Sequence, residues 1–281
     1  MDLTAIRTTI ITAIASDDTL LDLLVFKGGN ALEIVHKIGQ RSSLDMDYSM
    51  VADFTDTTTI ATLLFNALRA RFDPAGYVLF DEEFAPRPEN REPGALWGGY
   101  SATFKLIDMK LHQQLGGQLD YIRRQSVAIG PNNRRTFKIE ISAYEYCEGK
   151  IEVDIEGYIL SVYSIEMIAV EKLRAICQQS LNYPLRRHPT PRARDFYDIY
   201  AAVTEGGVDF ADPAIHYLVK KVFDTKQVPI DLILEIRERR EFHRQDWVTV
   251  QDAVRVRLKD FDYYFDLVLE ETKKLQPLWV V

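Results

Sequence analysis

The sequence lacks several features that define common protein classes. Only two cysteines occur in 281 residues, Cys147 and Cys177, and neither belongs to a CxxC pair or lies near a histidine cluster with zinc-site spacing. This distribution supports neither a disulfide framework nor a zinc site, so we expect both thiols to be reduced and structural. No apolar run is long enough to span a bilayer, and we therefore expect a cytoplasmic protein without a membrane partner.

The sequence also lacks an excess of basic over acidic residues. The 34 Lys and Arg residues are outnumbered by 42 Asp and Glu residues, which gives a net charge of -8. A polyanionic partner would therefore have to bind a local basic patch, because the surface as a whole repels it. The fingerprints GxxxxGK(S/T) and GxGxxG do not occur, which gives no support to a P-loop or a dinucleotide-binding turn. The 47% of hydrophobic and 27% of charged residues indicate a normal globular chain.

Hydrophobic periodicity predicts an α+β part followed by a mainly helical part. In the first part it predicts an amphipathic helix at the amino terminus, further helices over 31–37, 58–72 and 108–124, and strands over 23–26, 44–48, 99–107 and 136–143. Residues 81–97, which include three prolines, predict a loop. From residue 164 the pattern is helical, with segments at 164–179, 194–203, 213–224, 229–240 and 250–274. We therefore expect an α+β domain over 1–160 and a helical domain over 161–281 that completes the cleft.

Two carboxylates lie on the predicted strand 44–48. Asp45 and Asp47 are two residues apart, so their side chains share one face of the strand with Cα atoms about 6.6 Å apart. That spacing allows both to reach a shared divalent ion or an ion pair about 3.5–4 Å apart. The two charges repel each other and require a compensating cation or a raised pKa, and magnesium with a triphosphate would compensate them. By itself, this pattern more often marks a solvated strand end.

A Gly-Gly turn precedes these aspartates. Gly28 and Gly29 follow the predicted strand 23–26 and open a short helix, where backbone N–H groups and the helix dipole favour a phosphate. Such a turn alone is usually structural. Together with Asp45, Asp47 and Glu140 on a neighbouring predicted strand, it describes a site for metal-dependent phosphoryl or nucleotidyl transfer.

Further charged candidates occur in the helical part. Lys172 is either a phosphate ligand or a solvated lysine, and Asp195 and Asp198 follow Arg194 at spacings that also fit a local ion pair worth only ~0.3–0.5 kcal/mol. A loop stiffened by two prolines concentrates four arginines that are the best candidates for a nucleic-acid contact, the alternative being a solvated loop. These are Arg186, Arg187, Arg192 and Arg194.

Four motifs in the same order resemble a known family. They are KGGNAL at 27–32, RSSLDMD at 41–47, YSIEMIAVEKLR at 163–174 and RDFYDIY at 194–200. They resemble the KGGTxL, RxSxDxD, EKLxA and RDxxD motifs of the AbiEii/AbiGii nucleotidyltransferase-like toxins of type IV toxin–antitoxin and abortive-infection systems. The resemblance extends over residues 26–200, and the remaining residues add only helical character.

The resemblance implies a polymerase-β-like nucleotidyltransferase fold with a mixed sheet, Mg²⁺ or Mn²⁺, a nucleoside triphosphate donor and a cognate antitoxin encoded nearby. Some family members add nucleotides to the acceptor end of tRNA, which makes tRNA an expected acceptor. By position, Asp45 and Asp47 would be metal ligands, and Asp195 would position Lys172 or assist the attacking hydroxyl. Nucleotide contacts are implied at Lys27, Gly28, Gly29, Asn30, Arg41, Ser43 and Lys172.

Two departures from the family pattern leave alternatives open. Asn30 stands where threonine or serine is commoner, and the third acid is the longer Glu140. We therefore keep three hypotheses: a nucleotidyltransferase in which Glu140 or Asp195 helps to activate the acceptor hydroxyl, a non-catalytic nucleotide-binding module, and a kinase-like phosphotransferase. A role of Asp198 in catalysis, the nucleotide preference, the acceptor and the oligomeric state stay open.

Overall fold

The computed structural model of the chain describes residues 1–39, 41, 43–91, 95, 97–129, 133–185, 188–254 and 256–279. By its internal contacts the chain forms two compact units, each discontinuous in sequence. Unit 1 comprises Met1–Phe26, Leu44–Tyr144 and Glu152–Val162, and unit 2 comprises Lys27–Ser43, Glu145–Ile151 and Tyr163–Val281. The predicted domains were consecutive segments, so segments 27–43 and 145–151 fall in the unit opposite to the one that the sequence assigned them.

Unit 1 is built on a seven-stranded mixed sheet in the order β3-β4-β5-β2-β1-β7-β6. β2 pairs with β5 and β1 with β7 in parallel, whereas β4 pairs with β3 and β5 in antiparallel fashion. This sheet confirms the α+β class expected for the first part of the chain. The strands are β1 (Val25–Lys27), β2 (Asp45–Ser49), β3 (Tyr77–Arg87), β4 (Gly99–Asp108), β5 (Phe137–Ser142), β6 (Lys150–Ile155) and β7 (Tyr158–Tyr163).

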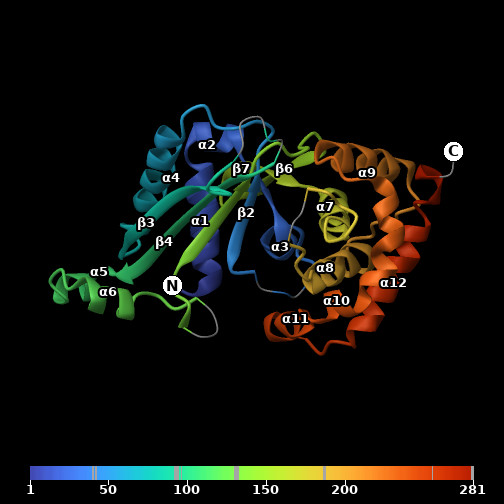
Figure 1. Ribbon diagram of the computed structural model, residues 1–281. Helices are drawn as coiled ribbons and strands as arrows, with labels where there is room; N and C mark the ends of the chain where they lie inside the picture. The colour runs from blue at the N-terminus through green and yellow to red at the C-terminus, as the bar shows by residue number, and fades with distance from the viewer. Residues whose placement is uncertain are drawn as a thin grey trace. The chain divides into compact units, whose positions relative to one another are not determined.

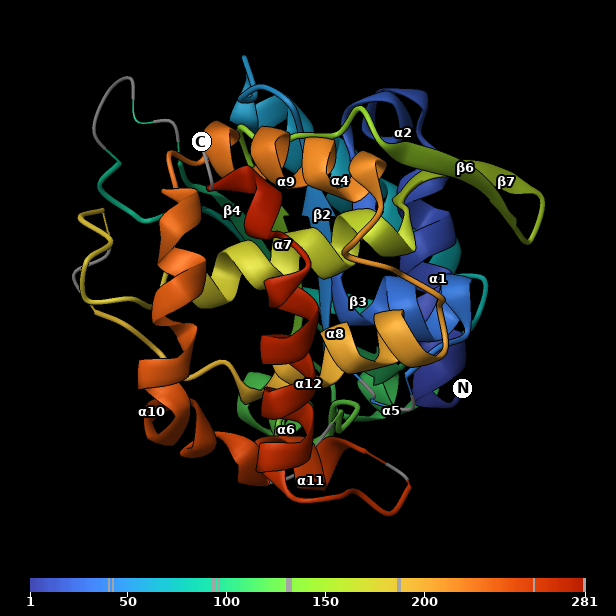
Figure 2. The same cartoon turned by 90° about the vertical axis from the view of Figure 1, so that its right-hand side faces the viewer.

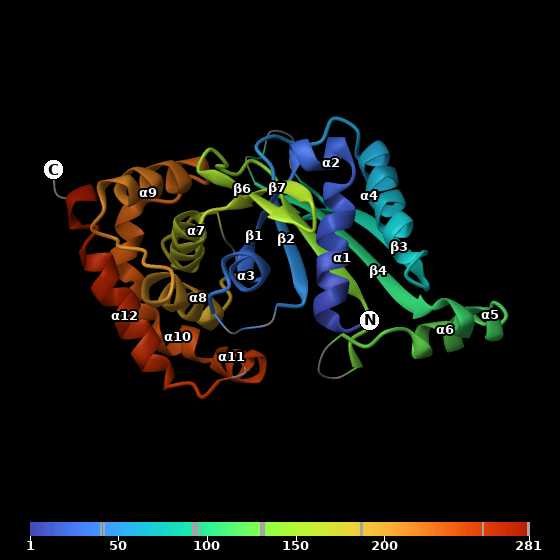
Figure 3. The same ribbon diagram turned by 180° about the vertical axis from the view of Figure 1, so that it is seen from behind.

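Three helices of unit 1 cover one face of this sheet: α1 (Leu3–Ala15), α2 (Asp18–Leu23) and α4 (Thr57–Phe72) (Figure 1, Figure 3). The Asp2 carboxylate accepts a hydrogen bond from the Ala5 N–H at 2.8 Å and caps α1, which buries Ile6, Ile10 and Ile14. The predicted amphipathic helix is therefore confirmed. Between β4 and β5, α5 (Met109–Gln114) and α6 (Leu119–Gln125) form an arm that extends beyond the strands.

Unit 2 is mainly helical, as the sequence predicted. Helix α7 packs against α8 and α9, and α8 packs against α11 and α12 (Figure 2). Phe196 stacks on Phe265 with ring centroids 4.9 Å apart, which places an aromatic cluster at the centre of these helices. The elements are α3 (Gly28–Asn30), the π-helix η1 (Ala31–His36), α7 (Ile165–Cys177), α8 (Ala193–Thr204), α9 (Pro213–Thr225), the 3-10 helix η3 (Ile230–Arg239), α10 (Arg240–Arg244), α11 (Trp247–Ala253), α12 (Phe261–Lys273) and the 3-10 helix η4 (Gln276–Leu278).

Three segments differ from their prediction. The predicted loop 81–97 is wrong as far as residue 87, since β3 pairs with β4 there. Its Pro86 is accommodated because β3 is an edge strand, where a missing N–H faces outward; residues 92–94 and 96 lie outside the described part. The predicted helix 108–124 is two helices, because Gly116 and Gly117 adopt φ values of 55° and 82°. The predicted helix 250–274 is also divided, into α11 and α12.

Some elements were missed or shifted. Helix α2 and strands β6 and β7 were not predicted from the sequence, and the strand predicted over 23–26 is the shorter β1, with Leu23 ending α2 instead. The segment predicted as a helix over 229–240 is largely the 3-10 helix η3. Strand β6 was missed although its sequence, KIEVDI, alternates polar and apolar residues, and four of its six residues are exposed.

Both cysteines are free and buried, as predicted. Burial raises the pKa of the Cys147 thiol to about 11, so it stays a neutral, unreactive thiol at neutral pH. Within the described residues, every helix is too short or too polar to cross a membrane.

The approach of β4 to β5 predicts a strong effect of Gly99→Ala. A Cβ atom at Gly99 would lie 1.8 Å from the Ile141 carbonyl oxygen, which is backbone and cannot move without breaking the strand pair. We expect the free energy of unfolding, measured by urea denaturation, to fall by more than about 3 kcal/mol.

Gly116→Ala is the matched control. Gly116 also has a positive φ of 55°, but no heavy atom lies within 4 Å of the added Cβ, so only about 1 kcal/mol of backbone strain is expected. Equal losses in the two variants would contradict the close approach of the strands.

Candidate functional site

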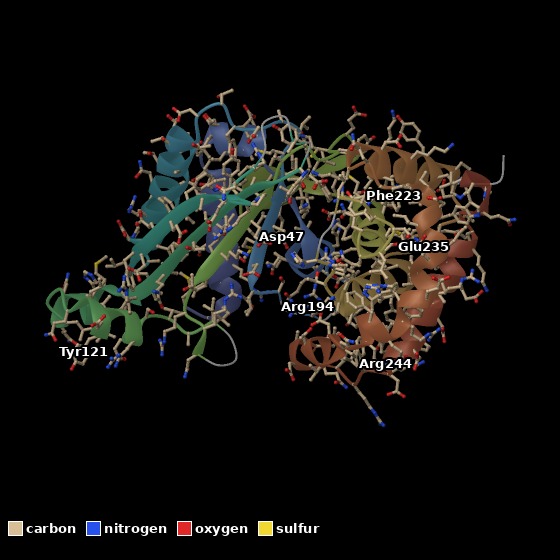
Figure 4. The ribbon with its side chains drawn as sticks, viewed as in Figure 1. Asp47, Tyr121, Arg194, Phe223, Glu235 and Arg244 are labelled. Atoms are coloured by element: carbon tan, nitrogen blue, oxygen red, sulfur yellow. The ribbon has the colours of Figure 1, made fainter. Side chains whose placement is uncertain are left out.

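The alternation of β2 places its two aspartates on one face of the sheet. Met46 and Tyr48 are buried, and Tyr48 lines a small cavity together with Ile11 and Ile14 of α1, in the helix layer. Asp45 and Asp47 are only half-buried, and their side chains point to the face away from that layer. Figure 4 shows Asp47 on β2. The predicted carboxylate face of this strand is therefore present.

Strand β5 brings further charged groups to the same face. In the parallel pair, Asp45 is opposite Lys138 and Asp47 is opposite Glu140. Neighbouring strands are about 4.8 Å apart, so Asp47 and Glu140 are adjacent side chains. Lys138 forms an ion pair with Glu140, whose side chain is 46% exposed. Unit 1 thus collects three of the predicted acids on two adjacent strands.

The donor set on β2 fits a divalent cation bound together with a substrate. In the part of the chain that the structure describes, no group of three or more His, Cys, Asp or Glu side chains is placed to hold a metal, so Glu140 does not complete a trio with the two aspartates. Mg²⁺ usually binds through one or two carboxylates, with waters and substrate phosphates filling the remaining positions. Asp45 already carries a cationic partner, because Arg134 Nη2 lies 2.6 Å from its Oδ1 atom.

In unit 2, the structure explains why both positions of the turn, 28 and 29, are occupied by glycine. Gly28 has a φ of 76°, in the left-handed region that favours glycine. A Cβ atom at Gly29 would lie 2.6 Å from Arg41 Nη2 and 3.4 Å from Ser43 Cβ. The turn therefore accepts the Arg41 guanidinium directly against its backbone. Asn30, which replaces the commoner hydroxyl residue, is fully buried in α3.

Arg41 begins a buried chain of alternating charges. Its Nε and Nη2 atoms donate to the two carboxylate oxygens of Asp198 at 3.0 and 2.8 Å. The Lys172 ammonium lies 3.1 Å from Asp198 and 2.9 Å from Asp195. Asp195 in turn lies 3.0 Å from the Nε atom of Arg192. This network joins the second, third and fourth sequence motifs within unit 2.

The network keeps its members charged despite their burial. Burial opposes ionisation of Asp198, but Arg41 and Lys172 outweigh it and lower its pKa to about 2. Burial likewise opposes the charge of Asp195, and Arg192 and Lys172 still hold its pKa below the usual value. Burial disfavours the Lys172 ammonium, whereas Asp195 and Asp198 more than compensate and raise its pKa. Lys172 is therefore a permanent cation.

A second buried network holds Lys27, the residue before the glycine turn. Lys27 Nζ lies 2.5 Å from Glu171, and Arg174 donates to Glu145 at 2.8 Å. Lys226 lies 3.3 Å from the same Glu145. Burial opposes the charge of Glu145, but Arg174, Lys27 and Lys226 lower its pKa to about 2. This network was not predicted from the sequence. The one local signal for part of it is the i, i+3 spacing of Glu171 and Arg174 on one helix face.

The arginine-rich segment is placed only in part. Arg186 and Arg187 lie outside the described residues. Arg192 is engaged with Asp195, and Arg194 donates from Nε to Thr249 Oγ1 at 3.2 Å instead of pairing with an aspartate of its own helix. The predicted nucleic-acid contact of this segment stays a prediction.

Comparison with known proteins adds a family and a fold. The family described as "Nucleotidyl transferase AbiEii toxin, Type IV TA system" matches residues 9–270. No curated protein sequence matches the chain. Among solved structures, MenT4, a nucleotidyltransferase toxin from Mycobacterium tuberculosis, is 14% identical, with a TM-score of 0.52 over 96% of this chain and 83% of that one. JHP933 from Helicobacter pylori is 15% identical, with a TM-score of 0.50 over 99% and 94%. These likenesses confirm a nucleotidyltransferase-like fold.

The buried network predicts that Asp198→Asn is strongly destabilising. The variant leaves Arg41 and Lys172 buried with one fewer carboxylate, and loss of one partner of a buried ion pair costs about 3–5 kcal/mol. Because the pKa of Asp198 is about 2 when folded and 3.8 ordinarily, its contribution is complete above about pH 4 and is lost as the pH falls toward 2. Urea denaturation from pH 2 to 7 should show a weaker acid-induced loss in the variant.

Asp266→Asn serves as the control. Asp266 pairs with Arg240, but its side chain is 60% exposed, so the change should cost less than about 1 kcal/mol. Similar losses at both positions would show that the buried network does not govern the stability of unit 2.

Proposed function

The chain belongs to the family of AbiEii nucleotidyl transferase toxins of type IV toxin–antitoxin systems, and on that premise we propose that it moves a nucleoside monophosphate from a nucleoside triphosphate to an acceptor hydroxyl. The observation that carries this proposal is the pair Asp45 and Asp47 on one face of β2, with Glu140 beside Asp47 on β5. An RNA 3′ end, such as that of tRNA, is the proposed acceptor.

Asp45 and Asp47 are the residues that would hold Mg²⁺ or Mn²⁺. Two carboxylates leave most positions of a hexacoordinate ion for water and for phosphate oxygens, which suits an ion that arrives with its nucleotide. When bound, the ion would neutralise negative charge on the triphosphate and on the departing pyrophosphate.

Glu140 is the proposed general base. Its side chain is half exposed and lies next to Asp47, whereas Asp195 is buried between Lys172 and Arg192 with a lowered pKa. A carboxylate held by two cations is a poor proton acceptor, so Asp195 is assigned to positioning Lys172. The acceptor hydroxyl would give its proton to Glu140 while its oxygen bonds to the α-phosphorus. The bond from that phosphorus to the bridging oxygen breaks, and pyrophosphate leaves.

The cationic residues of unit 2 are proposed to bind the triphosphate. Arg41 lies against the backbone of Gly29, and Lys172 is kept charged by Asp195 and Asp198. A cation that is already charged and held in place binds a polyanion without a further free-energy cost for protonation or reorientation. Membership in a toxin–antitoxin family also implies a cognate antitoxin.

The position of the transferred label is the decisive test of this reaction. Incubated with total RNA, Mg²⁺ and nucleoside triphosphates, the protein should transfer label from the α-phosphate, and label from the γ-phosphate should appear in pyrophosphate. Asp47→Asn should lower the transfer rate at least about 100-fold, because it removes one metal ligand and its charge.

Each alternative predicts a different outcome of the same assay. Transfer of the γ-label would establish a kinase-like phosphotransferase. Nucleotide binding without transfer of either label, with all four nucleotides and a folded protein, would establish a non-catalytic binding module.

Substitution of Glu140 tests the proposed base. Glu140→Gln keeps the size of the side chain but cannot accept a proton, and removal of a general base typically costs about 10²- to 10⁴-fold in rate. We expect kcat to fall within that range while nucleotide binding, measured by calorimetry, is kept. Glu152→Gln, the same change at an exposed position of β6, should leave kcat unchanged. If Glu140→Gln retains full activity while Asp195→Asn loses it, the two roles are exchanged.

A further inference from the structure

The arm of unit 1 exposes side chains that a simple connection between β4 and β5 would not need. In α5 no residue is buried, and in α6 only Ile122 is buried. Leu119 is 46% exposed and Tyr121 is 54% exposed on the same short helix. Figure 4 shows Tyr121 on the arm, at its outer surface. An exposed aromatic ring is a surface on which an unpaired base can stack.

The arm is also basic in an acidic protein. The two helices of the arm, over residues 109–125, contain three Lys and Arg residues and a single Asp, and the return segment over 126–136 adds Arg134 and Arg135, whereas the whole chain has a net charge of -8. A local basic segment on an acidic background concentrates positive potential where a polyanion can bind. The Arg124 guanidinium lies 5.9 Å from the centre of the Tyr121 ring, so a cation and an aromatic face are presented together.

The base of the arm is fixed to the sheet. Arg123 donates to both oxygens of Asp81 at 2.7 and 2.9 Å, and Lys105 lies 2.6 Å from the same carboxylate. The Val127 N–H donates to the Leu106 carbonyl at 2.8 Å. Arg123 therefore holds the arm against the sheet, and the neighbouring Arg124 is exposed to solvent.

The segment that returns from the arm reaches the carboxylates of β2. The Ile129 N–H donates to the Arg134 carbonyl at 2.8 Å, which closes the return segment. The side chain of Arg134 then contacts Asp45 Oδ1 at 2.6 Å. The basic arm and the candidate catalytic face are thus connected by a direct contact within unit 1.

We propose that the arm is the docking surface for the acceptor RNA and binds its unpaired 3′ end. A base stacks on Tyr121 and a backbone phosphate contacts Arg124. Arg134 contacts the RNA between the arm and the face that bears Asp45 and Asp47. Single-stranded nucleic acid suits this surface because unpaired bases can stack on an aromatic ring, whereas bases in a duplex are already stacked. An acidic peptide would use the arginine but would gain little from the ring. This inference rests on the proposed transfer to an RNA hydroxyl.

A matched pair on α9 provides the control. Tyr217 is 56% exposed and Lys221 Nζ lies 5.4 Å from its ring centre, so the pair resembles Tyr121 and Arg124 in exposure and chemistry. It belongs to unit 2 and is not part of the arm. Any general effect of removing an exposed cation and ring should therefore appear in both pairs.

The experiment measures binding of 5′-labelled bulk tRNA, with its unpaired 3′ end intact or trimmed, without nucleotide. The double variant Tyr121→Ala/Arg124→Ala should bind intact tRNA about 5- to 100-fold more weakly, as expected for one lost stacked base. Its logarithmic salt dependence should fall by about 0.7 for the lost phosphate contact. Tyr217→Ala/Lys221→Ala should bind as the wild type does. Tyr121→Phe, which keeps the ring, should also retain affinity, and all variants should keep the wild-type unfolding midpoint.

The outcomes separate this inference from the proposed reaction. Equal weakening by the two double variants, or equal affinity for intact and trimmed tRNA, overturns the docking surface. If the double variant weakens RNA binding although the wild type transfers no nucleotide, the docking surface stands and the proposed reaction fails. If transfer occurs normally in the double variant at limiting RNA, the reaction stands and the docking surface is overturned.

Discussion

The burial of Met46 and Tyr48 is the constraint on which the candidate chemistry depends. These two side chains anchor β2 against the helix layer, and because a strand alternates, their burial fixes Asp45 and Asp47 on the opposite face. The parallel register with β5 then sets Glu140 beside Asp47. A shift of one residue in β2 would bury the acids and expose the apolar pair, so packing energy in the core specifies where the charges lie.

Unit 2 contains several side chains that are buried and still charged. Arg41, Asp198, Lys172 and Asp195 alternate in sign, and each compensates the desolvation of the next. The close approach of Arg41 explains why Gly29 has no side chain. Glycine is therefore needed at this position because the Arg41 side chain packs against the turn. The same lack of a side chain would let a phosphate approach the backbone, so the motif serves both the fold and the proposed function.

Periodicity and spacing predicted the parts of the molecule that local sequence determines. The alternation of β2 and β5, the amphipathic α1, the helix α4 and the helical character of unit 2 were all visible in the chain. Long-range pairing was not visible, since nothing in residues 81–87, which are mostly charged and contain Pro86, indicates that they pair with β4 as an edge strand. Ion pairs between distant residues were not visible either. The sequence suggested that Asp198 pairs with Arg194 on the same helix, whereas in the structure Asp198 pairs with Arg41, 157 residues away. The family resemblance identified the motifs, and only the folded structure shows which of them share a network.

The most direct test of the account is whether the two aspartates of β2 bind metal together with nucleotide. Mn²⁺ can be titrated into the protein with the α,β-methylene analogue of each nucleoside triphosphate, and the bound ion followed by electron paramagnetic resonance. We expect a bound Mn²⁺ signal in the wild type and in Glu140→Gln, and its loss in Asp47→Asn. An Asp47→Asn variant that binds Mn²⁺ as tightly as the wild type would contradict the assignment of this face as the metal site.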